Sequence, residues 1–249
     1  MNKKKTLMIV ISAFLMAMVL SACGAGNSVQ AASKDPVVHT ETNGYGATAN
    51  RATDVRDERV GDGSGLLMGL SGDLTQEEVS DLLYMREEEK LARDVYAYLY
   101  SQWQFPVFDS IAQSEQNHMD SILELLTAYG IEDPAAQTAV GQFTNSTLQD
   151  LYDTLIVQGS TSLEEALRVG ALIEEVDIQD LDETLTRTDK VDLERVYSNL
   201  MFGSENHLRS FTSQLSRQLG ISYQPVQLDQ DRYDQIIADQ PGQRGRAGN

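Results

Sequence analysis

Four long stretches of the sequence repeat apolar residues at the spacing of an amphipathic helix, and no stretch alternates apolar and polar residues over the length of a strand. A shorter stretch of the same kind lies between the second and the third. The five stretches cover about 76–102, 107–129, 146–158, a segment that begins at 160–162, and 190–218. This pattern predicts an all-α fold, an antiparallel four-helix bundle whose longer crossover contains the short extra helix.

The expected helices carry start and stop signals. Thr75 and Ser162 are each followed three residues later by a glutamate, which is the spacing of a capping box. Asp189 is the predicted N-cap of the last long helix. Gly130 and Gly220 follow two of the apolar repeats and are the predicted stops.

Two of the three histidines lie in similar segments, SEQNH in the second long helix and SENH in the fourth. In the first segment Glu115 and His118 are three residues apart, so both lie on one helix face. In the second, the residue three before His207 is Ser204, and the nearest acid, Glu205, lies about 200° away around the helix. The fourth helix therefore lacks the carboxylate that the second provides.

Acids also interrupt the apolar faces of the other two helices. Glu174 and Asp177 form a second pair three residues apart, and the adjacent Glu175 is an alternate for Glu174. Glu88 and Glu89 fall on two overlapping stripes of the first helix, and the periodicity does not choose between them. A charged, solvated face is the other interpretation of this run. Carboxylates together with imidazoles are the ligands that iron, manganese and zinc bind.

The chain resembles the ferritin-like superfamily and, within it, the family of uncharacterised domains DUF2202. The resemblance covers about 77–238 and is carried by EEEKLARDVYAYL, FDSIAQSEQNHMDSILELLTAYGIEDP, ALIEEVDIQDL, SENHLRSF and YQPVQLDQDRYDQII. The first of these is similar to the rubrerythrin first-helix pattern, a ligand glutamate with a tyrosine seven residues on, here Glu89 and Tyr96. That similarity favours Glu89 over Glu88.

The resemblance implies a ferritin-like bundle with one or two ions of iron, or manganese, in its interior. The implied metal ligands are Glu89, Glu115, His118, Glu174, Asp177 and His207, with Glu88, Glu175 and Glu205 as alternates. The expected function is metal binding, with ferroxidase or peroxide reduction as its redox form, and whether the protein is an enzyme stays open. The alternative function is that of a non-catalytic cell-surface lipoprotein that uses the bundle as a binding or scaffold module.

The first 22 residues predict a lipoprotein signal peptide. Three lysines precede an apolar run that ends in LSAC, and Cys23 is the only cysteine of the chain, so lipidation of its thiol explains its presence. The predicted organisation is a signal peptide (1–22), a flexible tether (23–73), the helical domain (74–238) and a disordered tail (239–249). The predicted location is the extracytoplasmic face of the cell membrane, held by the lipid on Cys23.

The charge of the chain excludes one class of partner. The formal net charge is −19, and removal of residues 1–22 lowers it to −22 because that segment carries three lysines and no acid. Such a charge argues against binding to nucleic acid. The expected partners are a metal ion, the membrane through Cys23, and a second copy of the chain in a homodimer.

Overall fold

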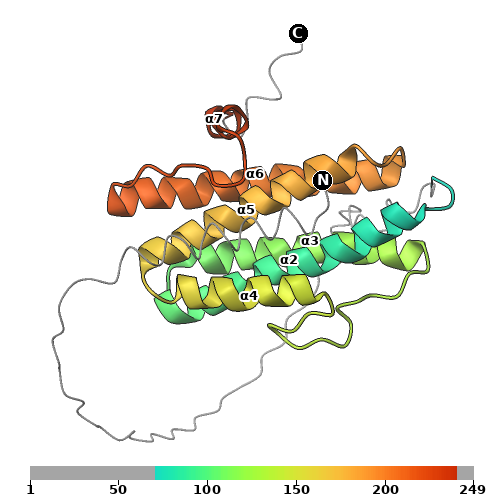
Figure 1. Ribbon diagram of the computed structural model, residues 1–249, viewed down its shortest axis with the longest axis horizontal. Coiled ribbons are helices and arrows are strands. Elements are labelled where there is room, and N and C mark those ends of the chain that lie inside the picture. The colour runs from blue at the N-terminus through green and yellow to red at the C-terminus, as the bar shows by residue number, and fades with distance from the viewer. Residues whose placement is uncertain (1–70, 240–249) are drawn as a thin grey trace, which may run out of the picture.

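The computed structural model describes residues 71–239, and every regular element in that range is an α-helix (Figure 1). The helices are α2 (Gln76–Trp103), α3 (Pro106–Ala128), α4 (Ser146–Gly159), α5 (Leu163–Leu185), α6 (Val191–Leu219) and α7 (Gln230–Ala238). No strand occurs between residues 71 and 239, which confirms the all-α prediction. None of these helices is both long and apolar enough to span a membrane. The predicted signal peptide, Cys23 and almost all of the predicted tether and tail lie outside the described residues.

Several helix ends follow the predicted signals. The Thr75 hydroxyl accepts a hydrogen bond from the backbone N–H of Glu78 at 3.2 Å, and the Glu78 carboxylate accepts one from the backbone N–H of Thr75 at 2.8 Å. This is the reciprocal capping box that satisfies two donors at a helix start. Gly130 and Gly220 have φ angles of 66° and 68°, the left-handed conformation that ends a helix after α3 and α6.

The prediction of Asp189 as an N-cap is wrong. α6 begins after Lys190, and Lys190 forms no side-chain cap. The Thr188 hydroxyl accepts the backbone N–H of Lys190 at 3.1 Å, which delays entry into the helix by one residue. The Asp189 carboxylate instead contacts the Lys190 ammonium at 3.1 Å on the surface.

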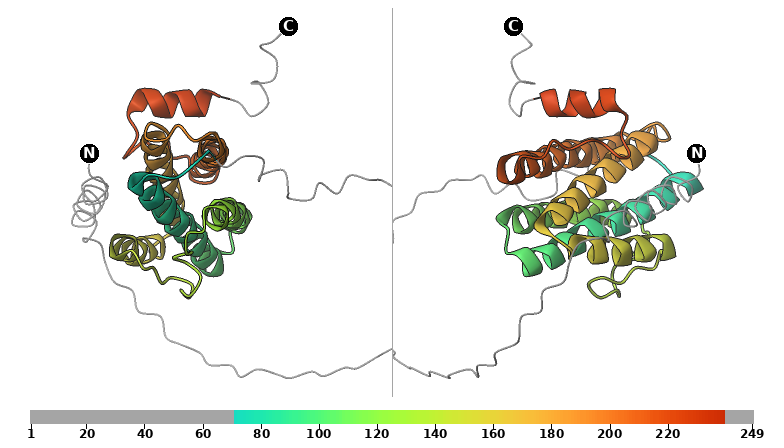
Figure 2. Two further views of the ribbon diagram at one scale, coloured as in Figure 1. Left: turned by 90° about the vertical axis from the view of Figure 1, so that its right-hand side faces the viewer. Right: turned by 60° about the vertical axis from the view of Figure 1, so that its left-hand side comes forward.

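The four long helices pack side by side. α2 packs against α3 and α5 packs against α6, while contacts of α2 with α5 and of α3 with α6 complete the arrangement. Figure 2 shows α7 outside these helices, next to α6, and α4 packs on the flank formed by α2 and α5. The facing sides of the four helices form an apolar core that includes Leu82, Ile122, Ala171 and Leu208, all fully buried.

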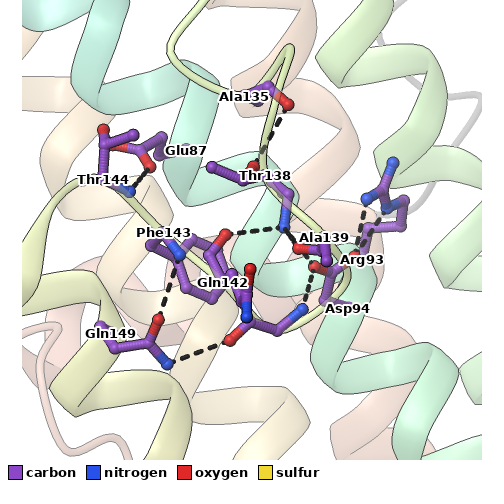
Figure 3. Close-up of polar contacts among 12 residues, drawn as sticks. Glu87, Arg93, Asp94, Ala135, Thr138, Ala139, Gln142, Phe143, Thr144 and Gln149 are labelled. Carbon is purple, nitrogen blue, oxygen red and sulfur yellow. Dashed lines mark hydrogen bonds and ion pairs between the residues drawn. The ribbon is translucent and has the colours of Figure 1, made fainter.

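The charged run Arg86–Lys90 of α2 is buried, with each residue at most 6% exposed, so its interpretation as a solvated face is wrong. Lys90 contacts the crossover between α3 and α4, and Figure 3 labels its partners Asp94, Ala139 and Gln142. Its ammonium donates to the carboxylate of Asp94 at 2.7 Å and to the backbone carbonyls of Ala139 and Gln142 at 2.8 and 3.1 Å. Asp94 also accepts the backbone N–H of Gly141 at 2.9 Å. The ion pair of Lys90 and Asp94 is therefore buried under the loop, and backbone groups of the loop form the hydrogen bonds that the pair leaves open.

Two neighbouring charges bind the two ends of the same loop. The Glu87 carboxylate accepts backbone N–H groups from Thr144 and Asn145 at 2.5 and 3.0 Å (Figure 3 shows the first). The Arg86 guanidinium forms a bidentate pair with Asp133, with distances of 3.0 and 2.9 Å. The crossover is thus fixed on α2 along its length.

We predict that Lys90→Met lowers the free energy of unfolding by about 2–4 kcal/mol, because Asp94 loses a buried cation and two loop carbonyls lose their donor. Urea denaturation followed by circular dichroism measures this change. Asn199→Met, at an exposed position of α6, is the control and should change the free energy of unfolding by less than about 0.5 kcal/mol. Equal, small changes in the free energy of unfolding of both variants would contradict this role of Lys90.

Candidate metal centre

The two histidines singled out in the sequence lie face to face across the contact of α3 with α6. These helices run antiparallel, since the earlier residue Ser114 of α3 lies beside the later residue His207 of α6, and Tyr129 at the end of α3 lies beside Asp192 at the start of α6. The imidazole rings of His118 and His207 stack with their centroids 5.5 Å apart and an interplanar angle of 28°. Both Nδ1 atoms point to the interior.

The carboxylate of Glu115 lies between the two rings. Its Oε2 is 2.8 Å from Nδ1 of His118, and its Oε1 is 2.8 Å from Nδ1 of His207. The three-residue spacing on α3 accounts for the first contact, and the antiparallel register of α3 and α6 accounts for the second. Glu115 therefore contacts both histidines with separate oxygens.

α2 and α5 each add a carboxylate, one on either side of Glu115. Oε2 of Glu89 is 3.1 Å from Nδ1 of His118, and Oε2 of Glu174 is 3.5 Å from Nδ1 of His207. Two groups of possible ligands result, one of Glu89, Glu115 and His118 and the other of Glu115, Glu174 and His207, and within each group the ligand atoms lie within 4.8 Å of one another. The two groups share Glu115.

Ser204 occupies the position on α6 where the second histidine lacks an acid, and it lies against the carboxylate of Asp177 from α5. Asp177 lies one turn after Glu174 on α5 and is buried, and the Ser204 hydroxyl on α6 donates a hydrogen bond to its Oδ2. Tyr96 makes a similar contact on the other side, where its hydroxyl donates to Oε1 of Glu174. Among the described residues, Asp177 belongs to neither group of possible ligands, so the structure places this predicted ligand beside the two groups, on a hydrogen bond from Ser204.

Burial raises the pKa of three of these carboxyl groups. Burial raises the pKa of Glu89 to about 7, although the nearby His118 opposes this change. The pKa of Glu174 is raised by burial and by the charge of Glu115, and the pKa of Asp177 is raised well above its usual range by burial and by the charge of Glu89. Without cations, burial therefore favours the protonated form of these three carboxyl groups.

The pKa of Glu115 is lowered and the pKa values of the two histidines are raised, so all three groups favour their charged forms. Burial alone would raise the pKa of Glu115, but the charge of His207 and hydrogen bonds to both rings bring it below its usual range. Burial alone would lower the pKa values of the histidines, but Glu89 and Glu115 raise that of His118 to about 12, and Glu115 and Glu174 raise that of His207 to about 10. The centre is thus a network of charges that stabilise each other.

The donor set is suited to transition-metal ions. Four carboxylates balance the charge of two divalent cations, so the loaded centre would be neutral in a buried site, where an unbalanced charge is costly. Oε1 of Glu89 and Oδ1 of Asp177 are buried and, among the described residues, accept no hydrogen bond. Buried carboxylate oxygens without a donor fit a bound cation, and carboxylates with imidazoles suit iron or manganese.

The alternate acids point away from the centre. The Glu88 carboxylate lies with Asp180 at the hydroxyl of Tyr84, on another side of α2. Glu205 pairs with the guanidinium of Arg232 on α7 at 3.1 Å. Glu89 is therefore the acid of its run that faces His118.

Glu175 has a different role from its neighbour. Its carboxylate accepts the hydroxyl of Tyr223 at 2.5 Å and the backbone N–H groups of Val226, Gln227 and Leu228 at 2.8, 2.7 and 2.9 Å. These contacts fix the segment between α6 and α7, hereafter the strap (residues 220–229), on α5. Glu174 faces the centre, and Glu175, about 100° further round the helix, binds the strap.

Two small residues that the sequence interpretation missed support the outer edges of the rings. The Ser114 hydroxyl lies 3.0 Å from Nε2 of His207. A Cβ atom on Gly203 would lie 2.4 Å from Nε2 of His118, so only glycine leaves room for that ring. Each lies four residues before the histidine of its own helix, and this spacing is the signal in the sequence that would have located them.

We predict that Gly203→Ala lowers the affinity for Fe(II) or Mn(II) by about tenfold or more, because the new methyl group displaces His118. Alanine is the better helix former by about 1 kcal/mol, so a loss would not come from helix propensity. Anaerobic titration of the metal measures the change. Ser198→Ala, at an exposed position of α6, is the control. Unchanged affinity in Gly203→Ala would show that the position of this ring is unimportant.

Known proteins provide a family for this chain. A family model described as "Uncharacterized protein domain (DUF2202)" matches residues 78–240. The uncharacterized protein MJ0754 of Methanocaldococcus jannaschii is 44% identical over 165 residues, which are 66% of this chain and 89% of that protein. The crystal structure of hypothetical protein MJ0754 from Methanococcus jannaschii is similar with a TM-score of 0.66 and 43% identity, and the match covers 68% of this chain and 96% of that one. The chain therefore belongs to the DUF2202 family.

Proposed function

We propose that the protein binds two transition-metal ions, iron or manganese, inside a ferritin-like four-helix bundle formed by α2, α3, α5 and α6. The observation that carries the proposal is the pair of ligand groups that share Glu115. Bundles of this kind bind two metals through carboxylates and Glu-x-x-His pairs on facing helices. The arrangement here has one such pair, Glu115 and His118, and replaces the second acid with Asp177.

The chain would hold one ion with Glu89, Glu115 and His118 and the other with Glu115, Glu174 and His207. Asp177 would complete the charge balance between them. Tyr96 and Ser204 would hold Glu174 and Asp177 in place through the hydrogen bonds that their hydroxyls donate.

Iron held in this way supplies electrons by changing oxidation state, which would support ferroxidase or peroxide-reducing activity. The residues around it would favour that use by excluding bulk water, since Glu89, Glu115 and Glu174 are each at most 2% exposed. The two imidazole edges are the most exposed parts of the centre, at 11% and 10% of their side-chain surfaces. Small solutes would therefore reach it between α3 and α6.

We further propose that the domain is tethered through lipid on Cys23 at the extracytoplasmic face of the membrane and that it can form a homodimer. The lone cysteine after the LSA sequence supports the tether. A scaffold lipoprotein without metal remains the second candidate. It would bind no metal and keep its stability in chelator.

Fe(II) titration without oxygen tests the proposal. The full-length protein should bind two equivalents, and the His118→Ala/His207→Ala double variant should bind none. The adjacent glutamates provide a matched pair: Glu174→Gln should lose an equivalent, whereas Glu175→Gln should keep both and lose stability through the strap. Equal binding by all four proteins, or by none, would contradict the proposal.

The pH dependence of stability provides a second prediction. In chelator, the free energy of unfolding should fall by a few kcal/mol between pH 5 and pH 8. Glu89 binds its proton more tightly in the folded protein, where its pKa is about 7, than in the unfolded chain, so its contribution is lost as pH rises to 7. His207, with its pKa raised to about 10, contributes in the same direction above pH 6.5.

Thermal unfolding in chelator at a series of pH values measures this dependence. Glu89→Gln removes one titrating group and should flatten the fall. Metal should reverse the trend, because cations displace protons more readily at high pH. Stability in chelator that rises from pH 5 to pH 8 would contradict the assignment.

A further inference from the structure

A large groove lies between the second half of α6, the first turns of α3, the strap and α7. Its volume is about 1050 Å³. Its lining contains the guanidinium groups of Arg209 and Arg217, the apolar side chains of Phe202 and Ile111, and many hydroxyl and amide groups, but no aspartate or glutamate. Volumes of this size accommodate extended ligands.

The absence of acids from this groove is unusual in the molecule. The chain carries 38 acids and a formal net charge of −19, yet residues 206–228, which form most of the groove wall, contain none. Two of the arginines of the chain lie in that stretch. A carboxylate in the groove would therefore meet cationic and neutral groups, whereas elsewhere the high density of acids would repel it.

Specific contacts hold the groove open. Nη1 of Arg209 donates to the backbone carbonyl of Ile236 on α7 at 2.7 Å, and Nη2 donates to Asn206 on α6 at 2.7 Å. Arg232 of α7 pairs with Glu205, and Glu175 fixes the strap. These contacts set the distance of α7 from α6, outside the four long helices (Figure 2).

The dimensions of the groove indicate what it binds. From Phe202 to Arg217 the helix rises about 22 Å, the length of about seven residues of extended chain. Arg217 is exposed at one end of this span and Phe202 at the other. One small anion could not contact both residues. Phe202 is 46% exposed and offers an apolar contact.

We propose that this groove binds an extended acidic peptide segment of a partner protein. A carboxylate of the segment pairs with Arg217, its backbone bonds to the hydroxyl and amide groups, and an apolar side chain packs on Phe202. This site is separate from the candidate metal centre and does not depend on metal.

Fluorescence anisotropy with a labelled octapeptide tests the inference. The probe carries a glutamate at one end and a leucine at the other, to match the span from Arg217 to Phe202, and its counterpart carries a glutamine instead. The full-length protein should bind the glutamate peptide about fivefold more tightly or better, and Arg217→Glu should weaken it about tenfold. Arg195→Glu, at an exposed position of α6 away from the groove, should change affinity less than about twofold.

A second variant, Ser213→Trp, fills the groove without changing its charge and should abolish binding of the peptide. Metal stoichiometry should be unchanged in Arg217→Glu and in Ser213→Trp, so the groove and the metal centre are tested separately. Equal affinity for the two peptides, equal losses in Arg217→Glu and Arg195→Glu, or binding that survives Ser213→Trp would overturn the inference.

Discussion

The contacts of Glu115 with two imidazoles are the interaction around which the interior is arranged. One carboxylate is 2.8 Å from both His118 and His207, and these belong to different helices. The contact fixes the register of α3 against α6. Glu89 and Glu174 then lie beside the two rings because α2 packs on α3 and α5 packs on α6. Burying this much charge demands counterions, whether protons, imidazolium groups or metal ions.

Adjacent acids in this chain serve different neighbours because successive residues of a helix point about 100° apart. Glu87 binds the crossover loop, Glu88 lies with Tyr84 and Asp180, and Glu89 faces His118. Glu174 and Glu175 divide in the same way between the centre and the strap. Glu87, Glu88 and Glu175 therefore stabilise the fold, whereas Glu89 and Glu174 belong to the candidate metal centre.

The sequence predicts the helices well because apolar spacing and capping signals are local. The capping box at Thr75 and the stops at Gly130 and Gly220 are confirmed. Asp189 fails as a cap because α6 begins one residue later, after Lys190, and the Asp189 carboxylate contacts the Lys190 ammonium on the surface. The choice between Glu88 and Glu89 could not come from periodicity, since both are buried and only the neighbouring helices distinguish them. Gly203 was missed because its importance depends on a ring from another helix.

Anomalous diffraction from crystals of the full-length protein loaded with Mn(II) or Fe(II) would test the central proposal most directly. The account predicts two anomalous peaks, one on each side of Glu115, with Glu89 and His118 at one and Glu174 and His207 at the other. Peaks elsewhere, such as beside Glu88 and Asp180, or no peak at a saturating metal concentration, would contradict it.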